Sequence, residues 1–358
     1  MTAAVVVRGA GGTPTVEEIL LGECGPGQVR VRIRAAGVCH SDLAMVDGTL
    51  TPPYPLVLGH EAAGEVVEVG SGVTRVRPGQ HVVLNWSPAC RACWFCRAGE
   101  PWLCATTSAA GVPRGSTAAG EPLHVALGLG AFADEVVVGG NAAIGVPDEL
   151  PWPVAALLGC AVLTGTGAVR NTARVVAGQS VVVIGLGGVG LSVVAAARAA
   201  GADPVVAVDV ADGKRPLAEA AGATDFVVAD DTLSKEVRRR TGGRGADVAF
   251  ECVGRAATIR AAWRATRRGG QVIVVGMGRG DDVVGLSALE IFSTARTLRS
   301  SVYGSADPDV EVPALAAAVL DGSLRLDHLV TDRIGLADVP AAFERMSRGE
   351  GARSVVLL

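Results

Sequence analysis

The chain has 358 residues, 49% of them apolar, so it is long enough for two domains that each bury a hydrophobic core. Its 32 basic and 36 acidic residues give a net charge of −4, which argues against a nucleic-acid or anionic-membrane partner. Two uncharged runs, 150–169 and 175–197, are long enough to span a bilayer, but Pro, Gly and hydroxyl residues interrupt them, so we expect no membrane span.

Residues 1–150 predict an antiparallel, half-solvated β region. The run 28–34, Gln-Val-Arg-Val-Arg-Ile-Arg, alternates apolar and charged side chains. Turn signals containing Gly and Pro recur between such runs. This region therefore predicts a sheet with one face on a core and one face in water.

Residues 175–302 have a different pattern, in which short β-branched runs alternate with helix-like stretches. The runs are apolar and bounded by Gly or Asp, as expected of parallel strands buried on both faces. They predict a doubly wound sheet of six strands. The runs are 181–184, 205–208, 226–228, 248–250, 272–275 and 298–302. Helices are expected at 313–320 and 339–348 and a last strand at 354–358, so an α/β domain interrupts a β-rich one.

A glycine loop follows the first of these strands and opens a helix. The motif G-x-G-x-x-G is formed by Gly185, Gly187 and Gly190, with Gly188 and Val189 between the last two. Such glycines let the backbone approach a pyrophosphate, and the helix N-terminus adds partial positive charge.

An acidic residue supports the same interpretation. Asp209 ends the next predicted strand, where a carboxylate accepts hydrogen bonds from an adenosine ribose and repels a 2′-phosphate, so it favours NAD over NADP. Lys214, in the following turn, is a candidate for the same ribose or an ordinary surface lysine. The alternative for the loop as a whole is a simple strand-to-helix turn in a glycine-rich chain.

Four of the eight cysteines lie close together in the sequence. The N-terminus shows no secretory signal, so we expect a cytoplasmic protein with reduced thiols, in which clustered cysteines are metal ligands or catalytic groups. The spacing Cys90-x2-Cys93-x2-Cys96-x7-Cys104 supplies four thiolates, which close a tetrahedral shell around a structural zinc. An Fe–S cluster uses similar spacing, but no Pro follows the last Cys here.

Three further ligand-type residues are widely spaced in the chain. Cys39, His60 and Cys160 together make the three-ligand set that leaves a fourth zinc position open for catalysis. A single Cys is most often a small buried hydrophobe, and sequence spacing does not establish that these three residues meet.

Along almost its whole length the chain resembles the zinc-dependent medium-chain alcohol dehydrogenases. The resemblance rests on Gly-Val-Cys-His-Ser-Asp at 37–42, Gly-His-Glu-Ala-Ala-Gly at 59–64, the four-cysteine run, Leu-Leu-Gly-Cys at 157–160, the glycine loop and Asp209. It implies a Rossmann-type six-stranded parallel sheet inserted into a β-rich GroES-like catalytic domain. The expected domains are 1–161 with 303–358 for catalysis and 162–302 for NAD binding.

The resemblance also implies roles for residues of the zinc sites. Cys39, His60 and Cys160 would hold a catalytic zinc, and the four clustered cysteines a structural one. Asp42 would accept a hydrogen bond from the far nitrogen of His60 and fix its tautomer. Glu61 would lie close behind the metal and ligate it transiently.

Proton transfer and cofactor contacts follow from the same resemblance. Ser41 would be the first proton acceptor from the alcohol, and His40 would lie near the cofactor pyrophosphate. Thr164 would lie near the nicotinamide, and Arg353 would approach the phosphates. Many relatives carry a proton-relay histidine five residues after the first zinc ligand, but this chain has Ala44 there, so the proton would leave through water or His40.

By position, the substrate pocket would include Leu50, Trp86 and Tyr303, which suggests a fairly apolar substrate. The alternative for each of these side chains is a place in a packed core. The leading hypothesis is a zinc- and NAD-dependent oxidoreductase that interconverts an alcohol with an aldehyde or ketone. The alternatives are a thiol-adduct, mycothiol-linked formaldehyde dehydrogenase and, more remotely, a nucleotide-binding protein without turnover. The family resemblance further implies a homodimer formed through residues near 290–305, with a tetramer as the larger option.

Overall fold

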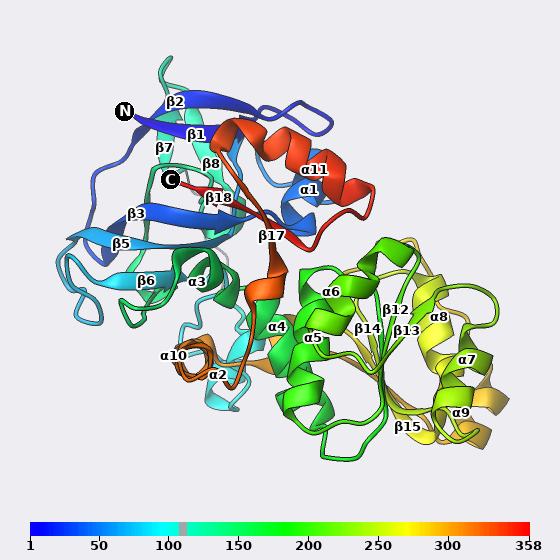
Figure 1. Cartoon of the computed structure of the whole chain (residues 1–358). Helices are drawn as coiled ribbons and strands as arrows, with labels where there is room; N and C mark the ends of the chain where they lie inside the picture. The colour runs from blue at the N-terminus through cyan, green and yellow to red at the C-terminus, as the bar shows by residue number, and fades with distance from the viewer. Residues whose placement is uncertain (107–112) are drawn as a thin grey trace. The chain divides into compact units, whose positions relative to one another are not determined.

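The computed structural model describes residues 1–106 and 113–358, which form two compact units (Figure 1). The first unit comprises Met1–Cys160, Asp307–Gly322 and Val330–Leu358, and the second comprises Ala161–Ala306 and Ser323–Leu329. The boundaries at 160/161 and 306/307 lie within a few residues of those expected from the sequence, at 161/162 and 302/303. The assignment of residues 323–329 to the second unit was not expected. The first is called the catalytic unit below and the second the cofactor unit.

Two sheets build the catalytic unit. One is a closed barrel in the order β1-β2-β7-β8-β4, and the other is a mixed sheet in the order β10-β6-β5-β3-β18-β17, with β9 paired to β3. Most pairs are antiparallel, and along β3 the valines point inward while the arginines lie nearer solvent, as the alternating sequence predicts. The strands are β1 (Thr2–Val7), β2 (Thr15–Leu21), β3 (Gln28–Gly37), β4 (Leu56–Val57), β5 (Glu61–Val69), β6 (His81–Leu84), β7 (Gly115–Thr117), β8 (Pro122–Val125), β9 (Glu135–Gly139), β10 (Ala143–Gly145), β17 (Val330–Ile334) and β18 (Arg353–Leu357).

The catalytic unit also contains α-helices between its strands. They are α1 (His40–Val46), α2 (Trp94–Arg97), α3 (Trp152–Leu158), α10 (Pro308–Leu320) and α11 (Val339–Ser347). Helix α10 begins at the point where the chain re-enters the unit, and Asp307 caps its N-terminus by accepting a hydrogen bond from the N–H of Asp309.

The cofactor unit is built on a six-stranded sheet in the order β13-β12-β11-β14-β15-β16, in which every pair is parallel. This is the 3-2-1-4-5-6 order of doubly wound dinucleotide folds, so the predicted fold class is confirmed. The strands are β11 (Val181–Ile184), β12 (Val205–Asp209), β13 (Asp225–Val228), β14 (Ala246–Glu251), β15 (Thr266–Val274) and β16 (Thr297–Ser300). The helices are α4 (Ala161–Gly167), α5 (Gly188–Ala199), α6 (Arg215–Ala220), α7 (Leu233–Arg240), α8 (Ala256–Ala265) and α9 (Ala288–Thr294).

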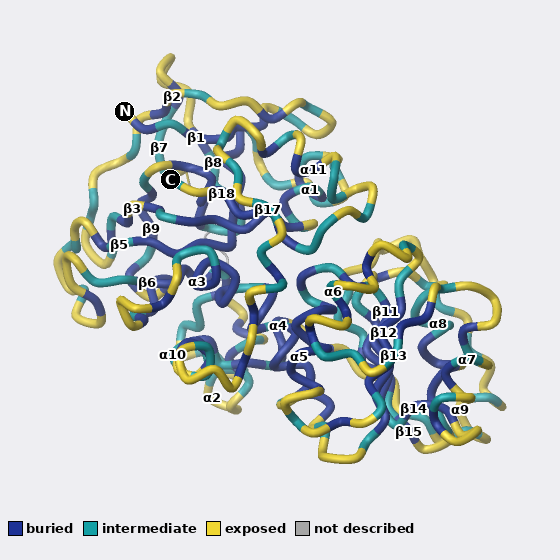
Figure 2. The backbone as a smooth tube through the Cα atoms, viewed as in Figure 1, coloured by how far each residue is buried: buried dark blue, intermediate teal, exposed yellow. Residues whose placement is uncertain are grey.

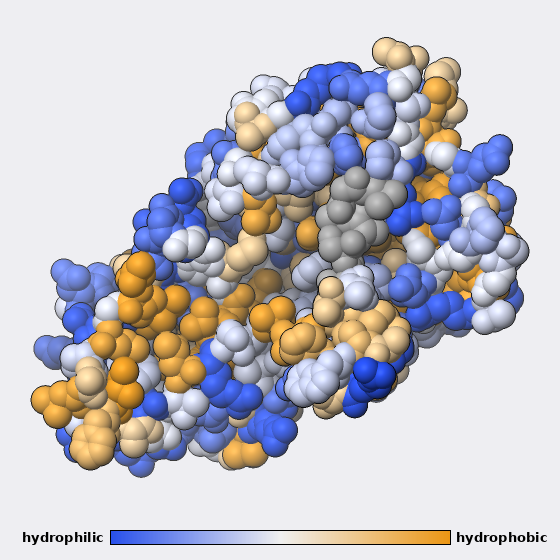
Figure 3. Space-filling view, turned by 180° about the vertical axis from the view of Figure 1, so that it is seen from behind, coloured by the Kyte–Doolittle hydropathy of each residue, from blue (hydrophilic) through white to orange (hydrophobic). Residues whose placement is uncertain are grey.

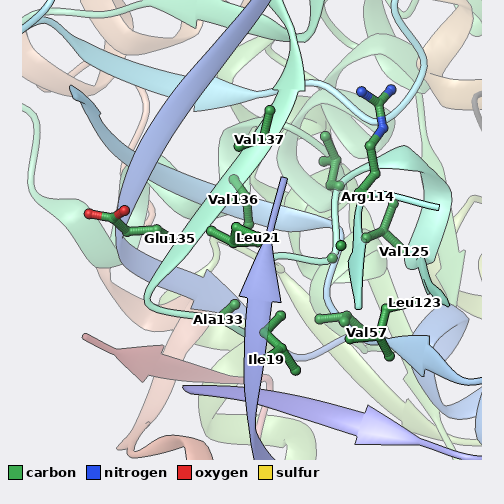
Figure 4. Close-up of a pocket in the computed structure, with 13 residues that line it drawn as sticks. Ile19, Leu21, Val57, Arg114, Leu123, Val125, Ala133, Glu135, Val136 and Val137 are labelled. Carbon is green, nitrogen blue, oxygen red and sulfur yellow. The ribbon is translucent and has the colours of Figure 1, made fainter. Parts of the chain in front are cut away.

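Each unit has its own apolar core along its strands, drawn dark blue in Figure 2. The barrel of the catalytic unit also encloses a small apolar pocket, lined by side chains such as Ile19, Val57, Leu123 and Val136 (Figure 4). Among the described residues no single helix is long and apolar enough to cross a membrane, and only the bent pair 152–158 with 161–173 meets that test when the two parts are counted together.

Candidate active site and zinc centres

Three loops of the catalytic unit bring the open ligand set together. Cys39 lies between β3 and α1, His60 and Glu61 stand at the start of β5, and Cys160 follows α3 (Figure 1). Their ligand atoms all lie within 4.8 Å of one another, and Nε2 of His60 is 3.6 Å from Sγ of Cys160. A tetrahedral zinc with bonds of about 2.0 Å to nitrogen and about 2.3 Å to sulfur needs a separation of about 3.5 Å between such atoms, so the donors fit zinc.

Asp42 sets the orientation of the imidazole. Its carboxylate is fully buried on α1, and Oδ1 accepts a hydrogen bond from the Gly59 N–H at 3.0 Å and lies 3.0 Å from Nδ1 of His60. Because Nδ1 faces the carboxylate, Nε2 is the ring nitrogen left for a metal.

The electrostatics of this cluster favour a cation. A hydrogen bond with Cys160 lowers the pKa of the Cys39 thiol well below its ordinary value, although burial opposes the shift. Burial also acts to lower the pKa of His60, but the charges of Asp42 and Cys39 outweigh it and raise that pKa well above its ordinary value. The lowered pKa of Cys39 favours the thiolate, which is the form of cysteine that binds a metal. The raised pKa of His60 reflects the negative charges of Asp42 and Cys39, which a divalent ion would neutralise.

Glu61 and Arg353 form a buried ion pair beside the ligands. Oε1 of Glu61 lies 3.1 Å from Nη2 of Arg353, and Nη1 of the arginine donates to the carbonyl oxygen of Val38 at 2.7 Å. Burial raises the pKa of Glu61 to about 8, with Arg353 opposing the shift. This pairing could not be predicted from the sequence, because no motif links two residues so distant in the chain, and the family resemblance placed Arg353 only near the cofactor phosphates.

Of the four clustered cysteines, Cys93 is the N-cap residue of α2, Cys96 lies within it, and Cys90 and Cys104 lie on either side of it in the chain. Sγ of Cys90 is 3.9 Å from Sγ of Cys96, and Sγ of Cys93 is 3.9 Å from Sγ of Cys104. All four are free thiols, and four sulfurs at about 2.3 Å from one zinc would be about 3.8 Å apart. A hydrogen bond from Thr106, with backbone N–H groups, lowers the pKa of Cys90 to about 5. The arrangement fits a closed, structural zinc shell.

Candidate proton-transfer groups flank the open set. Oγ of Ser41 lies 3.9 Å from Sγ of Cys39, and His40 is exposed as the first residue of α1. Ala44, which stands in place of the relay histidine of many relatives, is buried one turn further along this helix.

The cofactor unit positions the glycine loop at the carboxyl end of β11. A Cβ at Gly190 would collide with the carbonyl oxygen of Gly185, so helix and strand approach this closely only with glycine there, whereas Gly187 faces open space. Oδ2 of Asp209 accepts the N–H of Leu186 in the loop at 2.8 Å. The loop and the carboxylate therefore lie side by side at the carboxyl ends of the neighbouring strands β11 and β12.

Two further predicted cofactor residues lie in the same unit. Lys214 is buried, and its burial lowers its pKa while the charge of Asp209 opposes the shift, so the two side chains are electrostatic neighbours. Thr164 is the one residue of α4 that is not buried.

The three predicted pocket residues are divided between the two units. Leu50 and Trp86 are partly buried and pack against the core of the catalytic unit. Tyr303 is only 4% exposed and lies in a short turn of the cofactor unit. The apolar pocket of Figure 4 contains none of the three.

Comparison with known proteins gives consistent results. Residues 25–148 match the alcohol dehydrogenase GroES-like domain family, and residues 188–319 match the zinc-binding dehydrogenase family. The chain is 36% identical to S-(hydroxymethyl)glutathione dehydrogenase of Paracoccus denitrificans, over 99% of both chains. It is 34% identical to NDMA-dependent alcohol dehydrogenase of Amycolatopsis methanolica, over 99% of this chain and 98% of the relative. A crystal structure of an alcohol dehydrogenase zinc-binding domain protein from Burkholderia ambifaria matches with a TM-score of 0.94 and 33% identity, covering 100% of this chain and 98% of that one.

Proposed function

This chain belongs to the zinc-dependent medium-chain alcohol dehydrogenases, and from that membership we propose which of its residues carry the reaction and which substrates it accepts. The family resemblance, the enzyme class and the cofactors NAD and zinc predicted from the sequence are confirmed. The reaction converts an alcohol and NAD⁺ into an aldehyde or ketone, NADH and a proton, and it is reversible.

The buried set of Cys39, His60 and Cys160 carries the proposal, because it offers three zinc donors and leaves a fourth position for the substrate hydroxyl. Zinc held there supplies a Lewis acid that lowers the pKa of an alcohol, and the nicotinamide supplies the hydride acceptor. Asp42 keeps Nε2 of His60 directed at the ligand set. The cysteines of the second cluster serve the fold and not the chemistry, since their shell is closed.

Ser41 takes the hydroxyl proton of the alcohol in this proposal, because its Oγ lies beside the ligand sulfur of Cys39. His40 is the group that passes the proton to solvent, since it is exposed on the adjacent position and the usual relay position holds Ala44. Replacing His40 with Ala should slow proton release below neutral pH while leaving zinc content unchanged, and stopped-flow measurement with a pH indicator tests this.

Asp209 selects NAD over NADP. Its carboxylate stands at the end of β12 beside the glycine loop, where a 2′-phosphate would meet a negative charge. Lys214 supports the same ribose from its buried position next to Asp209. Equal or better kcat/KM with NADP would overturn this assignment.

The proposed substrate is a fairly apolar alcohol or aldehyde, with Leu50, Trp86 and Tyr303 as pocket residues. A thiol adduct of formaldehyde is the second candidate, since a relative with 36% identity over 99% of its chain is named S-(hydroxymethyl)glutathione dehydrogenase. A panel of alcohols and of formaldehyde, followed by NADH absorbance with and without glutathione or mycothiol, separates the two. Turnover of free alcohols without thiol supports the first candidate, whereas formaldehyde oxidation only with thiol supports the second.

A homodimer is the proposed assembly. Strand β16 forms an edge of the six-stranded sheet, and all four of its residues are exposed, so its backbone is a template for pairing with a second copy. Figure 3 shows apolar side chains gathered on the same unit, at the lower left of that view. The exposed apolar side chains of β16, of α9 just before it in the chain and of the residues just after it are Leu289, Ile291, Phe292, Leu298 and Val302.

Light scattering of the native protein and of a Phe292→Glu variant tests this assembly, with a dimer expected for the first and a monomer for the second. A monomeric wild type would contradict it. We also propose a cytoplasmic location, since all eight cysteines are free thiols, which persist in reducing compartments.

A further inference from the structure

A turn in the cofactor unit has an unusual backbone. In the segment Val302–Ser305, three consecutive residues adopt left-handed backbone angles, with φ of 50° at Tyr303, 71° at Gly304 and 47° at Ser305. Residues other than glycine rarely take this conformation, because Cβ crowds the carbonyl oxygen. Such runs persist only where the surroundings hold them, and they are concentrated at functional sites.

A buried hydroxyl cluster holds the two ends of this turn. Oγ1 of Thr172 lies 2.8 Å from Oγ of Ser301 and 2.9 Å from Oγ of Ser305. Thr172 is 1% exposed and Ser301 is 3% exposed, so water does not compete for the bond between them, while Ser305 is partly buried. One side chain therefore bridges the residue before the left-handed run and the last residue within it.

The segment that carries Thr172 is itself fixed to the turn. It is a π-helical turn, Ala168–Ala173, that continues directly from α4, a type of structure that is frequent at functional sites. Nδ2 of Asn171 donates to the carbonyl oxygen of Gly304 at 3.2 Å, and Nη1 of Arg299 donates to the carbonyl oxygen of Thr172 at 3.1 Å. These hydrogen bonds, called the clamp below, join the π-helical turn 168–173 to the segment 299–305.

The turn packs against α4 without any side chain between them. A Cβ on Gly167 would collide with the carbonyl oxygen of Gly304, and a Cβ on Gly304 would lie 3.0 Å from the carbonyl oxygen of Thr164. Thr164 is the one residue of α4 that is not buried. The left-handed turn therefore lies against Thr164, the residue that the family resemblance places near the nicotinamide.

We propose that Thr172 is a positioning residue for the dinucleotide, and that its buried hydroxyl holds the turn 303–305 in the left-handed conformation that cofactor binding requires. This inference rests on the proposed function as an NAD-dependent dehydrogenase, together with the family resemblance that places the nicotinamide beside Thr164. Thr172 acts through the turn, since its own side chain is buried beneath it. When the turn is already ordered in the free protein, none of the binding free energy of the cofactor is used to order it. Loss of the clamp should therefore lower the affinity for the cofactor and leave the rate of hydride transfer unchanged.

The test compares Thr172→Val, which keeps the shape and removes the hydroxyl, with Thr172→Ser, which keeps the hydroxyl. The zinc-loaded full-length protein is titrated with NADH by fluorescence, and KM for NAD⁺ and kcat are measured with the best alcohol of the substrate panel. We expect the Val variant to bind NADH about fivefold more weakly because, of its two lost hydrogen bonds, the one to Ser305 holds the left-handed run. Its KM for NAD⁺ should rise by a similar factor with kcat nearly unchanged, and the Ser variant should stay close to the wild type.

Thr166→Val is the matched control. Thr166 is equally buried and lies in α4, but its Oγ1 donates to the carbonyl oxygens of Val162 and Leu163 in its own helix, at 2.7 and 3.3 Å. Its loss should lower the melting temperature by about as much as the loss at Thr172 and leave NADH affinity unchanged.

Two results would overturn the inference: wild-type NADH affinity in Thr172→Val, or an equal loss of affinity in the Thr166 control. If Thr172→Val does not fold, Ser305→Ala removes the same bridge at its other end and is judged by the same titration. A wild-type protein that binds no NADH would instead refute the proposed function, so the two failures are distinguishable.

Discussion

Replacing Asp42 with Asn tests how the buried carboxylate supports the catalytic ligand set. Asn preserves the volume and the Oδ1 acceptor that faces both the Gly59 N–H and Nδ1 of His60, each at 3.0 Å. It removes the negative charge, and it places an NH₂ group where Oδ2 is buried without a hydrogen-bond partner. The variant therefore isolates the charge of this group from its shape.

The expected loss is in zinc affinity. A hydrogen bond to a charged group contributes about 1.5–3 kcal/mol and one between neutral groups about 0.5–1.5 kcal/mol, so losing the charge weakens the His60 contact by about 1–1.5 kcal/mol. The unsatisfied NH₂ group costs about 1 kcal/mol of folding stability, but it is present with and without zinc and so does not change zinc affinity. The loss of about 1–1.5 kcal/mol corresponds to roughly 5- to 13-fold in zinc affinity, near the lower end of the range known for partners of metal-ligating histidines.

Chelator competition monitored by metal analysis measures this affinity, with turnover followed as zinc is restored. Asp47→Asn is the control, because Asp47 is exposed at the end of the same helix and its Oδ1 accepts only the N–H of Thr49. We expect the Asp42→Asn variant to lose one zinc first and to regain activity at high zinc. Unchanged affinity, or equal loss of both zincs, would refute the role given to Asp42.

Three further changes give measurable outcomes. Gly190→Ala forces a Cβ against the carbonyl oxygen of Gly185, so NADH affinity should fall at least tenfold and the free energy of unfolding by about 1–3 kcal/mol, as measured by fluorescence titration and chemical denaturation. Asp209→Asn should raise the ratio of kcat/KM for NADP to kcat/KM for NAD about tenfold, which corresponds to about 1.4 kcal/mol. Steady-state kinetics with both cofactors measures this ratio, and an unchanged ratio would contradict the role given to Asp209. Asp309→Asn removes a carboxylate whose pKa burial tends to raise but hydrogen bonds from Arg75 and Arg91 hold below its ordinary value. Because the pKa of Asp309 is depressed in the folded state, its carboxylate should stabilise the wild type over the variant by up to about 1 kcal/mol above pH 5, and this difference should be lost as the pH falls below about 4. Free energies of unfolding measured from pH 8 to pH 3 should therefore differ between the two proteins at neutral pH and converge only at the acid end.

The sequence predicted best what depends on local spacing. Four cysteines within one short loop are bound to lie near one another, and in the structure their sulfurs lie within 4.8 Å. The order of β-branched runs and helices likewise predicted the parallel sheet, because each run is buried on both faces and shows this in its composition.

Features that depend on long-range packing were not predictable. The pair of Glu61 with Arg353 joins residues 292 positions apart, since 353 − 61 = 292, and nothing in either local sequence indicates it. The bridge from Thr172 to Ser301 and Ser305 spans 129 and 133 positions. Hydroxyl residues are too common to mark such a contact, and the left-handed angles at Tyr303 and Ser305 contradict their usual preference.

Zinc stoichiometry tests the central claim most directly, because the account assigns one ion to an open catalytic set and one to a closed structural set. Metal analysis of the full-length protein should give two zinc ions per chain. Cys39→Ser should retain one zinc, fold normally by circular dichroism and show no turnover. An active protein that holds a single zinc per chain, or a Cys39→Ser variant that keeps two zincs and full activity, would contradict the account.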